Sequence, residues 1–244
     1  MGRVWRVLGF VLVLGARPAL GGECTVALVG GEPALQHLDA EARLHFIHER
    51  LRIDARHARM WSYAWGAIYS SLAIGQLVAA PLVSHASGLD LYVGGGSALV
   101  GVIPLLVTPL KVMGDEERVD ELEAGTPTTA PCVALARAEE LLNRDAANEA
   151  QGRSLLFHGG NVVINAGIFF IIGAGFGHWT SATISLLTGI VTGEIMILTQ
   201  PVGALTALRQ YRRGELASPS AGVRIGIAPL LAKDSSGVVL ILIF

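Results

Sequence analysis

Four apolar segments dominate the pattern of hydrophobic and polar positions along the chain. They cover residues 61–83, 89–112, 155–177 and 180–205. A helix of about 20 apolar residues is long enough to cross the hydrocarbon core of a bilayer. The turns "SHASGLD" and "GHWTS" that join these segments in pairs are short. The pattern therefore predicts two transmembrane helical hairpins, residues 61–112 and 155–208, each with both ends on the same side of the membrane.

Charged residues at helical spacing precede each hairpin. Leu44, Ile47 and Leu51 fall on one helical face, and residues 133–150 behave in the same way. We predict an amphipathic stem helix in residues 22–60 and a second one in residues 113–154, each continuing into the span that follows it. The run "MGDEERVDELEAGTPTTAPC" at the start of the second region predicts a solvated acidic loop.

The two halves of the chain resemble each other. The stretch "VGVIPLLVTPL" aligns without a gap with "TGEIMILTQPV", which pairs Gly101 with Gly193 at an offset of 92 residues. Upstream, "ERLRIDA" aligns with "ELLNRDA" at an offset of 91, which pairs Asp54 with Asp145. We interpret this as a tandem duplication of one stem and one hairpin. Because each unit has an even number of spans, the repeats are expected to be parallel.

The two ends of the chain have different patterns. Residues 1–21 combine a basic start, an apolar stretch and small residues before a cleavage site near Gly21, which predicts a secretory signal peptide. The tail, residues 209–244, contains the β-branched runs "VRIGIAPLL" and "GVVLILIF" around the turn-forming "AKDSSG". This tail predicts a β-hairpin over about residues 223–244.

These elements together define the predicted fold class. We expect an all-α integral membrane protein with four transmembrane helices, arranged as two tandem duplicated hairpins with amphipathic stem helices, plus a small C-terminal β-hairpin. Composition agrees, since 16% of residues are charged and the mean hydropathy is +0.53, against about 25% charged residues in soluble domains. The formal net charge of −2 gives no reason to expect a nucleic-acid partner.

The charge distribution and the signal peptide predict opposite orientations. Apart from the signal peptide, all fifteen Lys and Arg residues lie on the stem side of the spans. The positive-inside rule would place that side in the cytoplasm, whereas a cleaved signal peptide would export it. Cys24 and Cys132 both fall on the stem side, which suits either a disulfide in an oxidising compartment or two unrelated thiols. We therefore expect a bacterial inner-membrane protein with a periplasmic stem, with the outer membrane as the alternative.

A carboxylate inside an apolar span is the main functional signal. Glu194 lies about 22 Å from the hairpin tip at 1.5 Å per residue, within a hydrocarbon core about 30 Å thick. His158, Asn161 and Asn165 stand at i, i+3 and i+7 on the facing span, so they share one helical face. We predict an intramembrane polar seam of these four residues. It has two readings: a device that fixes helix register, or a proton or cation relay.

Known catalytic and metal-binding patterns do not match the sequence, and we predict neither catalytic residues nor a metal or cofactor. The histidines of "HFIHERLRIDARH" do not have HExxH spacing and indicate a solvated stem face. The favoured hypothesis is a non-catalytic membrane scaffold that binds the lipid bilayer and a periplasmic protein, with homo-oligomerisation left open. The alternative is a small proton- or ion-linked transport protein that uses the seam. An enzyme is the third and less favoured class.

Overall fold

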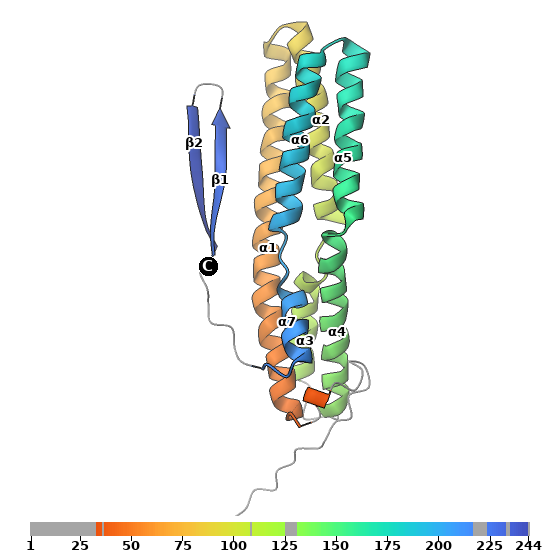
Figure 1. Ribbon diagram of the computed structural model, residues 1–244, viewed down its shortest axis with the longest axis vertical. Helices are drawn as coiled ribbons and strands as arrows, with labels where there is room; N and C mark the ends of the chain where they lie inside the picture. Colours follow the sequence, from red (N-terminus) through yellow and green to blue (C-terminus); the bar gives the residue numbers. More distant parts are fainter. Residues whose placement is uncertain are drawn as a thin grey trace, which may run out of the picture.

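The computed structural model describes residues 33–35, 37–107, 109–124, 131–216, 224–232 and 235–243. The predicted signal peptide and Cys24 lie outside these described residues, so the cleavage site and the disulfide both stay predictions. The described helices form a long bundle in which the two hairpin tips lie at one end (Figure 1).

One helix joins the stem to the membrane. After the short 3-10 turn η1 (Pro33–Leu35), α1 runs without a break over Ala40–Ala79, which is about 60 Å at 1.5 Å per residue. Asp39 caps its start by accepting a hydrogen bond from the backbone N–H of Ala42 at 3.2 Å. The first stem therefore continues directly into the first span, as the sequence predicts.

The first hairpin packs closely and ends earlier than expected. The turn η2 (Ala80–Leu82) leads into α2 (His85–Val107), so the second span stops at residue 107 and not at 112. A Cβ on Gly88 would lie 2.7 Å from the carbonyl oxygen of Ala80, so glycine permits this close approach at the tip. The acidic segment that follows is helical over α3 (Val112–Ala124). The prediction of a loop was wrong for these residues, because Val119 is fully buried against the stem and holds the segment in place.

The second half has the same order of elements with one difference. It comprises α4 (Pro131–Gly152), α5 (Leu155–Phe170), the π-turn η3 (Ile171–Gly175), α6 (Trp179–Thr199) and α7 (Gly203–Arg212). The second stem does not continue smoothly into its span, because the helix is interrupted at residues 153–154. The fourth span ends at Thr199, and the residues predicted to extend it to 205 begin α7 instead.

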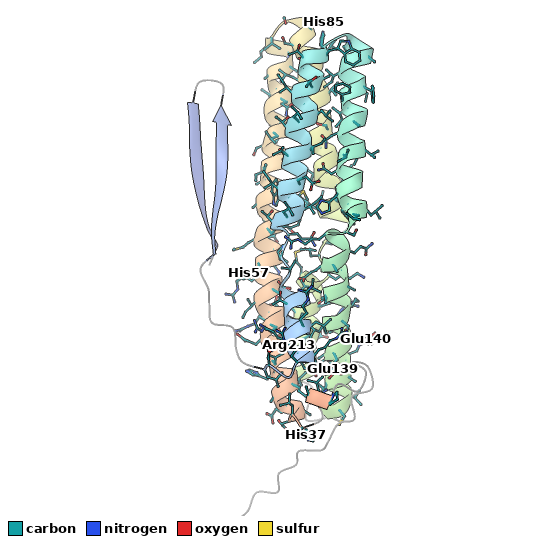
Figure 2. All side chains as sticks on the ribbon, viewed as in Figure 1. His37, His57, His85, Glu139, Glu140 and Arg213 are labelled. Atoms are coloured by element: carbon teal, nitrogen blue, oxygen red, sulfur yellow. The ribbon has the colours of Figure 1, made fainter. Side chains whose placement is uncertain are left out.

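The bundle divides into two parts along its length (Figure 1). The N-terminal half of α1 packs with α3, α4 and α7 into a stem that has its own hydrophobic core. Figure 2 places His37 at the stem end, His85 at the tip end and His57 between them. The core includes the stem residues that the sequence pattern placed on one face, and its fully buried members are Leu35, Ile47, Leu51, Ala55, Ala58, Val119, Ala134, Ala138, Leu142 and Tyr211.

The other part fits a membrane protein. Within the described part of the chain, four helices are long and apolar enough to cross a bilayer. Large apolar side chains on them face outward, for example Ile74 at 63% exposure and Val163 at 70%. We take the apolar parts, residues 61–83, 85–107, 155–175 and 179–199, as the spanning segments. The charged stem lies outside them.

Two strands follow in the tail. β1 (Arg224–Ala232) pairs antiparallel with β2 (Ser235–Ile243), with Arg224 opposite Ile243 and Ala232 opposite Ser235.

Candidate functional site

The four residues of the predicted seam meet between α5 and α6. The Nδ1 atom of His158 lies 2.6 Å from Glu194 Oε2. The Nδ2 atom of Asn161 donates to Glu194 Oε1 at 2.9 Å and to the carbonyl oxygen of Ile190 at 3.0 Å. Both oxygens of the Glu194 carboxyl group therefore have a partner on the facing helix.

Asn165 extends the hydrogen bonding by one turn toward the tip. Its Nδ2 atom donates to the backbone and side-chain oxygens of Asn161, each at 2.9 Å. The two amides fit because glycines stand opposite them on α6. A Cβ on Gly189 would overlap the Asn165 side chain, and one on Gly193 would overlap that of Asn161. The glycine spacing on α6 thus makes room for the seam.

The seam lies within the apolar segments, in the half nearer the stem, and it is partly exposed. His158 and Glu194 are each 29% exposed at the side chain. Glu194 is five residues before the end of α6, about 8 Å inside the apolar segment. An ionisable side chain at this depth costs free energy unless hydrogen-bond partners compensate for the lost water. Here the His158 imidazole and the Asn161 amide are the partners of the Glu194 carboxyl group.

The hydrogen-bond ladder ends at Asn165 within the described residues. Toward the tip, the hydroxyls of Thr188 and Thr183 donate to carbonyl oxygens of their own helix at 2.8 and 2.9 Å. From Asn165 to His178 at the tip is thirteen residues, or about 20 Å of helix. In a single chain the ladder therefore reaches across only part of the membrane.

A second polar group joins the spans to the stem. The indole N–H groups of Trp61 and Trp65 on α1 each lie 3.2 Å from Thr199 Oγ1, at the end of α6. Arg153 donates to the carbonyl oxygens of Ile197 and Leu198 at the C-terminus of α6, where carbonyl groups run short of intrahelical donors. The Ile197 carbonyl also accepts from the backbone N–H of Gln200. These contacts fix α6 to the first hairpin and to the break between α4 and α5.

A layer of buried carboxyl groups lies just below this junction, and sequence reasoning did not predict it. Asp54 Oδ2 accepts from the backbone N–H of Ala204 at 2.7 Å. Glu149 accepts from the same N–H at 3.2 Å and from that of Leu205 at 2.8 Å. Carboxyl groups from α1 and α4 thus cap the N-terminus of α7, where backbone N–H groups lack helical partners. Burial and the adjacent Asp54 side chain raise the pKa of Glu149 to about 9.

Two further acids share the layer. Asp115 on α3 is ion-paired with Arg144 and with Arg118. Asp145 is 1% exposed, and neither of its side-chain oxygens has a hydrogen bond of standard geometry. Burial, followed by the nearby Asp115, raises the pKa of Asp145 to about 9. The stem therefore holds acids that carry protons at neutral pH.

Ion pairs also close the two ends of the bundle. At the stem end Arg43 is buried with Glu139 and Tyr211, joining α1, α4 and α7, and Figure 2 shows Glu139 within the stem. At the tips His178 Nδ1 lies 2.6 Å from Asp90 Oδ1 and links the two hairpins. These two residues are 88 positions apart, and sequence reasoning missed the pair because nothing in the two turns indicates that their side chains become neighbours.

The remaining candidates from the sequence do not assemble into a site. The Nε2 atom of His48, one of the stem histidines, lies 2.5 Å from Asp120 Oδ1 of α3. Among the residues that the structure describes, no group of three His, Cys, Asp or Glu side chains is arranged to hold a metal ion. Cys132 lies at the start of α4, on the stem side as expected.

No protein-family model matches the chain, and no curated protein or solved structure matches it either.

Proposed function

We propose that this chain is a non-catalytic, multi-pass membrane scaffold that presents its stem to a protein partner on the exported side. The observation that carries the proposal is the continuity of α1, which belongs to the stem core at one end and to the first span at the other. A single helix of this length transmits position without a hinge. The caps on α7 and α6 tie the second hairpin to the same stem.

The limited length of the seam supports the scaffold proposal. It ties α5 to α6 through both carboxyl oxygens of Glu194, and it ends about 20 Å from the tip. A relay across the membrane needs a path over the full thickness of the core. The single chain supplies such a path over only part of it.

Proton-linked transport is the second candidate. It is favoured by one observation, the partly open His158–Glu194 pair inside an apolar segment. Ionisable residues in such segments commonly serve transport. Four spans are few for a transporter, so a homo-oligomer would be needed to enclose a path.

We propose a bacterial inner membrane with a periplasmic stem, with the outer membrane as the alternative. The predicted signal peptide and the predicted Cys24–Cys132 disulfide support this orientation, and the fifteen basic residues of the stem side argue against it. A membrane-impermeant maleimide applied to intact cells tests it. Labelling of both cysteines only after reduction supports export, whereas labelling only after lysis contradicts it.

Site-specific photo-crosslinking in cells tests the scaffold proposal. A photoreactive residue replaces Arg137, which is exposed on the stem helix α4, and in a matched control replaces Leu187, which is exposed on the span α6. A scaffold should give a discrete heteromeric adduct from the stem position and none from the span. An adduct of twice the chain mass from the stem would indicate self-association and contradict a separate partner.

Proton flux in vesicles separates the two candidate functions. Wild-type and Glu194→Gln proteins are reconstituted into vesicles that contain a pH-sensitive dye, and the decay of an imposed pH gradient is compared with that in protein-free vesicles. The scaffold proposal expects all three decays to be equal. A faster decay with wild type that Glu194→Gln abolishes, at equal protein content, would instead establish transport.

A further inference from the structure

The first hairpin carries a groove of about 550 Å³ between α1, the stem-side end of α2 and the start of α3. Its α1 wall runs from Arg59 to Ser70, and Val102 and Leu106 form part of the α2 wall. Tyr63 and Leu106 are each 74% exposed, so the groove opens on the outer face of the hairpin. Its volume falls within the range of small-molecule sites, about 300–1,000 Å³.

The groove has the length of one membrane leaflet. Eleven residues separate Arg59 from Ser70 along α1, which is about 16 Å of helix. Half of a hydrocarbon core about 30 Å thick is about 15 Å. The groove begins at the boundary between the charged stem and the apolar segment, which is where the headgroups of that leaflet lie.

The stem end of the groove carries an arginine, and most of the remaining lining is apolar. The Nη2 atom of Arg59 donates to the carbonyl oxygen of Met113 and is ion-paired with Glu116, so α3 fixes the guanidinium at this end. These contacts engage Nη2, and an arginine side chain has further donors on Nε and Nη1. Ser62 lies one turn away and also lines the groove. Arginine is well suited to binding a phosphate.

The second hairpin shows why the groove is open. Tyr69 packs on Gly101 just as Asn161 packs on Gly193. Tyr69 corresponds to Asn161, and Gly101 to Gly193, at an offset of 92 positions. At the same offset, Gly66 and Val102 of the groove correspond to His158 and Glu194. The second hairpin thus places a histidine and a glutamate where the first has a glycine and a valine. A Cβ on Gly66 would meet nothing within 4 Å, so this position is left open in the first hairpin.

We propose that the groove binds one phospholipid, with an acyl chain along Gly66 and Val102 and the phosphate beside Arg59. The length of the groove, its apolar walls and its fixed cation at the headgroup level carry this assignment. It requires membrane insertion but does not depend on the scaffold proposal.

Filling the groove tests the proposal. The full-length protein is purified in detergent, and phosphatidylglycerol is titrated in while native mass spectrometry measures the lipid retained. Gly66→Leu should weaken the tightest binding about tenfold, equivalent to losing the burial of roughly two methylene groups. Gly75→Leu is the matched control, because it is on the same helix, outside the groove, and also has nothing within 4 Å of an added Cβ.

Two further arms make the result decisive. Ala67→Leu, a second substitution within the groove, should behave like Gly66→Leu, and circular dichroism confirms that each variant retains its helix content. Diacylglycerol with the same acyl chains should be retained less than phosphatidylglycerol by the wild-type protein. Equal binding by Gly66→Leu, Gly75→Leu and wild type, or equal retention of the two lipids, would overturn the proposal.

Discussion

The cap on α7 allows a sharp test of how the stem is held together. Replacing Glu149 by alanine removes the acceptor of the Leu205 N–H, while Ala204 keeps its bond to Asp54. One buried unpaired donor costs about 1–3 kcal/mol, and the lost burial of one methylene adds about 0.8 kcal/mol. We expect Glu149→Ala to lower the free energy of unfolding by about 2–4 kcal/mol, a large share of the usual 5–15 kcal/mol.

Glu149→Gln is the informative control. Because the pKa of Glu149 is raised to about 9, the side chain carries a proton at pH 7. Glutamine reproduces that neutral group, since its amide accepts from the Leu205 N–H and donates toward Asp54. We expect a loss of less than about 1 kcal/mol for this variant. Thermal unfolding in detergent, followed by far-UV circular dichroism, measures both variants.

Two results would refute this reasoning. If Glu149→Gln were as destabilising as Glu149→Ala, the native group would be ionised and the assigned direction of its pKa would be wrong. If neither variant lowered the melting temperature, the carboxyl cap would not hold α7 to the stem.

Two other predictions follow from the same geometry. The free energy of unfolding should fall as pH rises from about 4 to 9. Asp145 and Glu149 have usual pKa values of 3.8 and 4.5, and in the folded protein they hold their protons up to about pH 9. Each group lowers the free energy of unfolding by at most about 1.4 kcal/mol per pH unit. Melting temperatures at pH 5, 7 and 9 measure it, and a flat profile would contradict it. Gly193→Ala should displace the Asn161 amide and lower the melting temperature, whereas Gly160→Ala, where nothing lies within 4 Å of an added Cβ, should not.

The interior of the stem could not be predicted from the sequence. Asp54, Asp115, Asp145 and Glu149 come from three helices and lie in charged runs that usually indicate solvated faces. One signal was present, because the internal alignment paired Asp54 with Asp145. A shared position in two stems suggests a common role, but the alignment does not say that both side chains point inward.

The prediction of a loop for the acidic segment after α2 was wrong for a related reason. Its density of Asp and Glu predicts a loop, since isolated like charges repel within a helix. In the folded stem, Arg59 and Arg144 pair with Glu116 and Asp115, and Val119 is buried. Tertiary neutralisation therefore permits a helix that local composition disfavours.

Local pattern by itself determined the spans, the face of the first stem and the residues of the seam. Apolar length fixes the spans, and the 3.6-residue period places His158, Asn161 and Asn165 on one face. The helix break at residues 153–154, the carboxyl layer over α7 and the Asp90–His178 pair were decided only by the tertiary structure. Each depends on which distant helices become neighbours, and a periodic pattern carries no information about that.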